Sequence, residues 1–157
     1  MLVVPGTFGG RIGWNDRAPK KEPAVNDSFD SDTLRLIDGT REVRIETSRD
    51  EDAPTHRTTI WVVTVDGTVF VRSVRGGKGR WYTEVSANPA AALHVGDERL
   101  PVRAVPVTDD ATIAAVSEAY REKYGRTSPG STRAMMQPET LPTTLGLEPA
   151  REGASPN

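Results

Sequence analysis

The chain has 157 residues, of which 36% are hydrophobic, with a formal net charge of −2 and no cysteine. This length suits one domain with its own core, and the balanced charge gives no general attraction to nucleic acid or to an anionic membrane, so we expect neither as a partner. Without cysteine there is no disulfide and no thiolate zinc site, and the lack of a long apolar run or a signal-peptide pattern leads us to expect a cytoplasmic protein.

Both ends of the chain are predicted to lie outside the folded domain. Residues 1–27 are rich in glycine, proline and charge and show no sustained periodicity, which is typical of a flexible tail. The glycines at positions 6, 9, 10 and 13 resemble a phosphate-binding loop, but the residues after them cannot form an amphipathic helix, so we favour the tail. Residues 150–157 form a second polar tail, which leaves residues 28–149 as the domain.

The domain is predicted to begin with a short helix and a strand. Residues 30–32 supply helix N-cap residues, and Leu34 and Ile37 give a short apolar stripe that Gly39 ends. Within residues 41–47, apolar or threonine side chains alternate with charged ones, which predicts a half-buried strand.

A β-hairpin is the strongest local signal. Two runs of β-branched and aromatic residues, 60–65 and 68–74, are separated only by Asp66 and Gly67. A two-residue Asp-Gly loop favours a type I′ turn, which needs positive φ at both central positions.

This turn fixes the register of the hairpin and assigns its two faces. The predicted cross-strand pairs include Val63–Phe70, Trp61–Arg72 and Thr59–Val74, and the second of these would allow a cation–π contact. Because side chains alternate between faces, the opposite face is expected to join the core. Its residues are Ile60, Val62, Val69 and Val71.

The second half of the domain adds helices and strands around the hairpin. We predict a short helix over 79–88, strands over 90–95 and 99–107, a long helix over 108–124 capped by Thr108 or Asp110, a loop over 127–138 and a strand over 140–147. At least five strands with helices at the margins predict a mainly β, α+β fold built on a small barrel, not a parallel α/β sheet.

The segment after the hairpin carries the strongest candidate binding site. Four basic residues alternate with three glycines, which allow close backbone approach to an anion; they are Arg72, Arg75, Lys78 and Arg80, with Gly76, Gly77 and Gly79. Trp81 and Tyr82 follow and could stack on a ligand ring. The alternatives are a solvated hairpin end and aromatic residues that pack on the core.

No residue pattern specifies a reaction. The two histidines, His56 and His94, lie far apart without cysteine, so we expect no metal site. His94 is expected to be a hydrogen-bonded structural residue, and Tyr120 to pack on a helix face. With Tyr82, these two residues remain the candidates for catalytic roles.

The middle of the chain resembles the split β-barrel superfamily of flavin- and deazaflavin-binding proteins, which includes pyridoxamine-phosphate oxidase and the deazaflavin-dependent reductases. Within it, residues 30–149 look closest to an uncharacterised bacterial family. The resemblance is carried by WVV at 61–63, VFVRSVRG at 69–76, WY at 81–82 and AYREKYG at 119–125.

The resemblance implies a split-barrel homodimer that binds FMN or a deazaflavin at its interface and reduces or oxidises a small organic molecule. Carried over by position, the cofactor-binding residues would be Arg57, Thr59, Trp61, Arg72, Ser73, Gly76, Gly77, Lys78, Trp81 and Tyr82.

Two other functions remain open from the sequence. One is a cofactor-free enzyme of small-molecule biosynthesis whose substrate lies in the barrel cavity beside Tyr82, His94 or Tyr120. The other is a protein that binds a ligand without catalysis. A barrel filled with side chains would argue against the first of these.

Overall fold

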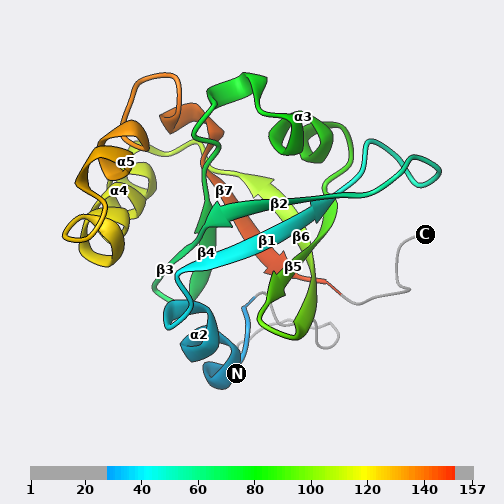
Figure 1. The fold of residues 1–157 in the computed structure, drawn as a ribbon, viewed down its shortest axis with the longest axis horizontal. Coiled ribbons are helices and arrows are strands. Elements are labelled where there is room, and N and C mark those ends of the chain that lie inside the picture. Colours follow the sequence, from blue (N-terminus) through cyan, green and yellow to red (C-terminus); the bar gives the residue numbers. More distant parts are fainter. Residues whose placement is uncertain (1–27, 151–157) are drawn as a thin grey trace, which may run out of the picture.

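The computed structural model describes residues 28–150, so the predicted N-terminal tail and all but the first residue of the predicted C-terminal tail lie outside the described residues. The elements, shown in Figure 1, are α2 (Ser31–Asp38), β1 (Glu42–Thr47), β2 (His56–Trp61), β3 (Val63–Val65), β4 (Thr68–Val71), the 3₁₀ turn η1 (Gly76–Lys78), α3 (Arg80–Ala87), β5 (Ala90–Val95), β6 (Glu98–Pro106), α4 (Asp110–Tyr124), α5 (Pro129–Ala134), the 3₁₀ turn η2 (Leu141–Thr143) and β7 (Leu145–Pro149). None of the helices in the described part of the chain is long and apolar enough to span a membrane.

The strands form one seven-stranded antiparallel sheet in the order β2-β1-β5-β6-β7-β4-β3. β2 and β3 are separated in the chain only by Val62, yet they stand at opposite ends of this order. The two edges of the sheet therefore meet at Val62, and the sheet curls into a half-open barrel flanked by helices (Figure 1). This confirms the predicted α+β split-barrel fold.

The predicted hairpin turn is confirmed, but the predicted strand pairing is wrong beyond Val63. Asp66 and Gly67 have φ of 51° and 82°, as a type I′ turn requires, and Val63 lies opposite Phe70. Beyond Val63 the predicted pairing stops, because β2 pairs with β1 and places Trp61 opposite Glu42.

The break occurs at Val62, whose backbone groups leave the strand ladder. Its N–H donates to the Tyr124 hydroxyl (3.1 Å), and its carbonyl accepts from Lys123 Nζ (2.8 Å). Both partners come from α4, which packs on β3. Val62 and Val63 are consecutive and both buried, because each faces a different apolar cluster. A helix distant in the sequence thus ends the hairpin pairing.

The larger apolar cluster fills the inside of the barrel and contains the predicted core face of the hairpin. Ile37 enters it from α2, and Trp81 and Val85 enter it from α3. These two helices lie at opposite ends of the barrel in Figure 1. The second cluster lies between the β3–β4 hairpin and α4, and Tyr120 and Tyr124 are fully buried in it.

Most of the remaining predicted elements are present, with three corrections: the N-cap of α4, an additional helix and the start of the last strand. The N-cap of α4 is Asp109, whose carboxylate accepts from Thr112 N at 2.9 Å, and not Thr108 or Asp110. The predicted loop over 127–138 contains α5, a six-residue helix with proline in its first turn that is too short to show an apolar period. The late strand begins only at Leu145, after η2.

Candidate functional site

The separation of β2 from the end of β4 opens a pocket of about 450 Å³. Residues that the hairpin pairing would have joined, such as Thr59 and Val74, now lie on its walls. We call it the split pocket; it is lined by Thr58, Thr59, Ile60, Arg72, Ser73, Val74, Arg75, Gly79, Arg80 and Trp81. Four of the ten predicted cofactor-binding residues line it, namely Thr59, Arg72, Ser73 and Trp81.

Arg72 contributes to this wall, but its guanidinium points into the protein. The side chain is 1% exposed and lies 5.6 Å from the Tyr120 ring centroid, so the predicted contact with Trp61 is wrong. Its four closest acceptors are Thr144 Oγ1 (2.8 Å), Ser117 Oγ (2.9 Å), Ile113 O (2.8 Å) and Met135 O (3.1 Å). Arg72 therefore joins β4 to α4, α5 and the segment before β7.

The glycine loop is held by internal contacts. Ser73 Oγ donates to Gly76 O (2.8 Å), and Ser73 N donates to Thr143 Oγ1 (3.0 Å). Gly76 has φ of 67° and faces Glu139. Gly77 and Lys78 are exposed and do not line the split pocket.

Positive charge at the split pocket comes from two arginines and a helix end. Arg75 and Arg80 are exposed pocket residues, and neither forms an ion pair with another residue of the described chain. Gly79 is the N-cap of α3 and has no side chain to accept from the first-turn N–H groups. Free N–H groups and the positive end of the helix dipole favour an anion at this position.

The aromatic residues contribute less to this pocket than the sequence suggested. Trp81 is 6% exposed and belongs to the barrel core, with Tyr82 packed against that core and edge-on to the indole at 6.1 Å. Trp61 lies outside the split pocket and stacks on Tyr124, with ring centroids 3.9 Å apart.

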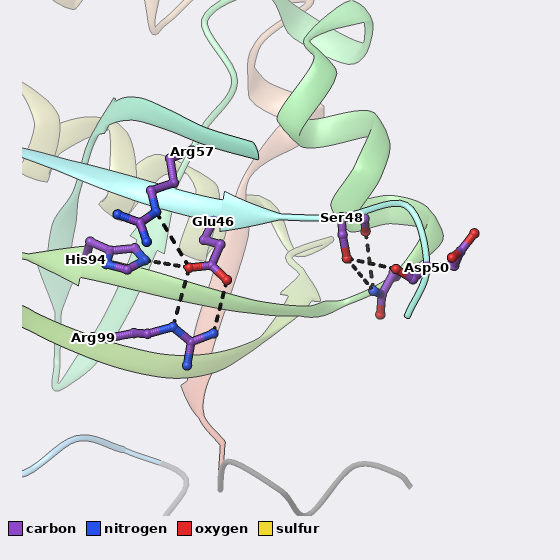
Figure 2. Close-up of polar contacts among 7 residues, drawn as sticks. Glu46, Ser48, Asp50, Arg57, His94 and Arg99 are labelled. Atoms are coloured by element: carbon purple, nitrogen blue, oxygen red, sulfur yellow. Dashed lines mark hydrogen bonds and ion pairs between the residues drawn. The ribbon is translucent and has the colours of Figure 1, made fainter. Parts of the chain in front are cut away.

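His94 belongs to a charged cluster on the outer face of the sheet, shown in Figure 2. Its Nε2 shares a hydrogen bond with Glu46 Oε1 at 2.7 Å, Arg99 Nη2 lies 3.1 Å from Oε2, and Arg57 Nε lies 3.8 Å from Oε1. The Arg99 hydrogen bonds, followed by those from His94, lower the pKa of Glu46 against the opposing effect of burial. His94 is thus hydrogen-bonded, and Arg57 pairs with an acid instead of lining the split pocket.

The three catalytic candidates are not brought together. Tyr82 packs on the barrel core, His94 lies on the outer sheet face, and Tyr120 lies on the buried face of α4 in the second apolar cluster. Among the described residues the Tyr120 hydroxyl has no hydrogen-bond partner, and burial raises its pKa far above the ordinary value. Within residues 28–150 no three acidic or histidine side chains are arranged to hold a metal ion.

A bacterial family model described as "Uncharacterized protein conserved in bacteria (DUF2255)" matches residues 33–147. The chain belongs to this family. The matched span contains every residue of the split pocket. No curated protein matches the sequence.

Several solved structures have folds similar to this one. The heme storage protein HutZ from Vibrio cholerae is 14% identical with a TM-score of 0.58, over 79% of this chain and 92% of that chain. An F420-H2 dependent reductase, FDR-A, is 19% identical with a TM-score of 0.53, over 68% and 92%. A putative pyridoxamine 5'-phosphate oxidase from Listeria innocua is 14% identical with a TM-score of 0.52, over 77% and 91%. At such identities these likenesses show the fold alone, which is the one predicted from the sequence.

Sequence reasoning missed two features of this region. Glu46 and His94 are 48 residues apart, and only the pairing of β1 with β5 makes them neighbours. Thr58 and Val74 line the split pocket only because the hairpin opens. The sequence carries a signal for the β1 strand itself but none for which strand it pairs with.

Proposed function

We propose that this protein binds a flavin-type cofactor, FMN or a deazaflavin, in the split pocket and acts as an oxidoreductase on a small organic molecule. The observation that carries the proposal is a pocket of about 450 Å³ with two arginines at the start of α3. Neither Arg75 nor Arg80 has an ion-pair partner among residues 28–150, and Gly79 gives the helix no side-chain cap. The likeness to a deazaflavin-dependent reductase and to a pyridoxamine-phosphate-oxidase-like protein supports this choice of cofactor class.

The residues present fit the anionic part of such a cofactor. A pocket of this volume lies within the range of small-molecule sites. Arg75, Arg80 and the first N–H groups of α3 would hold the phosphate, and the hydroxyls of Thr58 and Thr59 are available for further hydrogen bonds. Ring stacking on Trp81 receives less support, because the indole is committed to the core.

The chain's own part in a reaction would be to bind and orient. When bound, a reduced flavin or deazaflavin supplies the hydride for transfer. The arginines would fix the phosphate end, and the apolar wall at Ile60 and Val74 would shield the ring from water. No side chain of the described pocket is placed as a dedicated acid, so the proposal gives the protein no proton-transfer residue.

Heme is a less suitable ligand for the split pocket. HutZ is described as a heme storage protein, and heme iron is commonly held by histidine. Here His56 is bonded to Glu84 (2.8 Å) and His94 to Glu46, and neither lines the split pocket.

The cofactor-free alternative receives no support from the barrel interior. That space is filled by the larger apolar cluster, and neither Tyr82 nor Tyr120 borders the split pocket. The second candidate function is ligand binding without catalysis. The split pocket carries positive charge but no evident acid or base, and such a protein needs neither.

A homodimer forms part of the proposal. The split pocket is open on one side, and Val74 on its rim is 55% exposed although it is apolar. A second copy over this rim would cover both the apolar side chain and the ligand. Light scattering coupled to size-exclusion chromatography would test the stoichiometry, and a purely monomeric protein at micromolar concentration would contradict it.

The test is a titration with FMN and with F420, followed by fluorescence quenching. Arg75→Gln and Arg80→Gln are each expected to weaken binding about tenfold, as loss of a charged hydrogen bond does. Arg103→Gln, an exposed change on β6 away from the pocket, is the matched control. Arg72→Ala is unsuitable because it would leave buried acceptors without a donor.

Two results would decide the proposal. Failure to bind either cofactor at saturating concentration would reject it. Binding that is sensitive to Arg80→Gln, but with a reduced cofactor that is never reoxidised by any organic acceptor, would leave the non-catalytic binding protein as the function.

A further inference from the structure

A second hollow, of about 360 Å³, adjoins the split pocket. The two share Thr59 and Val74 on their walls, so they are neighbours. We call the second hollow the indole pocket; its other lining residues are Arg41, Glu42, Trp61, Ser128, Ser131 and Met135. No part of the cofactor proposal uses it.

Tyr124 covers one face of the Trp61 indole, and the side chain is partly exposed in the indole pocket. Trp61 stacks on Tyr124 at 3.9 Å with an interplanar angle of 3°, and Tyr124 is fully buried. The Tyr124 hydroxyl lies 2.6 Å from Arg41 O and accepts from Val62 N, so the stack is anchored to the backbone. The accessible part of Trp61 is therefore its opposite face and edge, at the wall of the indole pocket.

Arg41 places a cation beside this aromatic wall. Its guanidinium carbon lies 5.6 Å from the Trp61 centroid and 5.2 Å from the Tyr124 centroid, nearly equal distances that put it alongside the stack and not on its outer face. It donates to two neutral hydroxyls, Thr127 Oγ1 at 2.8 Å and Ser128 Oγ.

These contacts leave Arg41 able to bind an anion. Two of the five N–H groups of a guanidinium are engaged, so three remain. Within residues 28–150 no carboxylate lies within ion-pair distance of Arg41. A fixed indole face, apolar contacts from Val74 and Met135 and an arginine at the edge together complement a flat ring with one acidic group.

We infer that the indole pocket is a binding site for a planar aromatic carboxylate, with its ring on Trp61 and its carboxylate on Arg41. This deepens the function proposed above, on which its catalytic meaning rests, by naming the substrate class. A molecule held here would lie next to a cofactor in the split pocket, because the two pockets meet at Thr59 and Val74. Glu42 on the same rim disfavours a ligand with further negative charge.

The probes are 2-naphthoate and its neutral counterpart 2-naphthalenemethanol, titrated by calorimetry into the full chain without cofactor. We expect 2-naphthoate to bind at least tenfold more tightly than the alcohol. Arg41→Met should weaken the carboxylate at least tenfold and leave the alcohol unchanged, and Glu42→Gln should strengthen the carboxylate a few-fold. Trp61→Leu should weaken both probes, and the milder Trp61→Phe replaces it if the leucine variant fails to fold.

Arg80→Gln separates this inference from the cofactor proposal. Arg80 lines the split pocket and not the indole pocket, so 2-naphthoate binding should not change in the Arg80→Gln variant. Equal affinity for the two probes, or no response to Arg41→Met in a folded protein, would overturn the inference. Loss of FMN and F420 binding with 2-naphthoate binding intact would reject the cofactor and leave the aromatic carboxylate site standing.

Discussion

Ser73 Oγ occupies the position next to Gly79 that a side chain would need. A β-carbon built on Gly79 would lie 2.5 Å from Ser73 Oγ, and that hydroxyl is itself fixed by its hydrogen bond to Gly76 O. The segment after β4 and the start of α3 are therefore in direct contact at the wall of the split pocket. Glycine at 79 is required for this packing, in addition to any approach of a ligand.

Gly79→Ala is expected to destabilise the protein by about 1–3 kcal/mol, since added volume in a packed site forces neighbours apart. Gly77→Ala is the matched control, because no atom lies within 4 Å of its added β-carbon, and it should change stability by less than about 0.5 kcal/mol. Urea unfolding measures both. Equal effects of the two substitutions would show that the Ser73 contact is not what excludes a side chain.

The two buried tyrosines of α4 are expected to respond in opposite ways to loss of their hydroxyls. Tyr120→Phe should be neutral or stabilising by up to about 1 kcal/mol, because its buried hydroxyl has no hydrogen-bond partner within residues 28–150. Tyr124→Phe should cost about 1–3 kcal/mol, because its hydroxyl bonds the backbone of Arg41 and Val62. Urea unfolding of both variants tests this prediction. A marked loss of stability in Tyr120→Phe would show that the Tyr120 hydroxyl forms a hydrogen bond in the folded protein.

Because of Lys123, the free energy of unfolding should increase as pH rises from 8 to 10. Burial lowers the pKa of Lys123 to about 8 from its ordinary 10.5. Between these values the unfolded chain binds more protons than the folded protein, so the free energy of unfolding increases with pH. Tyr124, whose pKa burial raises to about 12, acts in the opposite direction only above pH 10.

Lys123→Met is expected to remove this rise. The measurement is the difference in unfolding free energy between the natural chain and the variant at intervals from pH 7 to 10. A difference that stays constant across that range would mean that Lys123 titrates at its ordinary pKa in the folded protein.

The contacts of Glu46 with His94 and Arg99 should stabilise the protein at neutral pH, and this stabilisation should be lost in acid. The pKa of Glu46 is lowered, so the stabilisation is complete above the ordinary carboxyl pKa of 4.5 and disappears as pH falls through the lower folded value. Glu46→Gln should cost about 1–2 kcal/mol at pH 7, with a smaller difference at pH 3.

Glu118→Gln provides the comparison for Glu46. Glu118 also pairs with an arginine, at 2.9 Å, but its side chain is 59% exposed. Its substitution should change stability by less than about 0.5 kcal/mol, because surface ion pairs contribute little. If Glu46→Gln and Glu118→Gln lose the same stability, the burial of Glu46 does not strengthen its contacts.

The sequence alone predicted those features that depend on neighbouring residues. The Asp66-Gly67 turn, the strand with alternating Val43 and Ile45, and the helix that Asn88 and Pro89 end all follow from local backbone preferences. The split-barrel fold also followed, through family resemblance and the count of strands. Short irregular pieces such as α5 were missed, because six residues are too few to carry a helical period.

The site needed the tertiary structure, because its key groups change role when distant elements pack. Arg72 was predicted to help bind an anion, yet acceptors from α4, α5 and Thr144 hold its guanidinium inside the protein. Trp61 was predicted to face Arg72 and instead stacks on Tyr124.

The sequence by itself determined the hairpin turn, the order of the longer strands and helices along the chain and the basic glycine segment, because each depends on adjacent residues. Only the tertiary structure decided where the hairpin stops. Tyr124 and Lys123 bind the backbone of Val62 and turn β2 toward β1, and that turn opens the split pocket. Local propensity extends the hairpin to Val74, whereas hydrogen bonds from α4, some 60 residues away, end it at Val63.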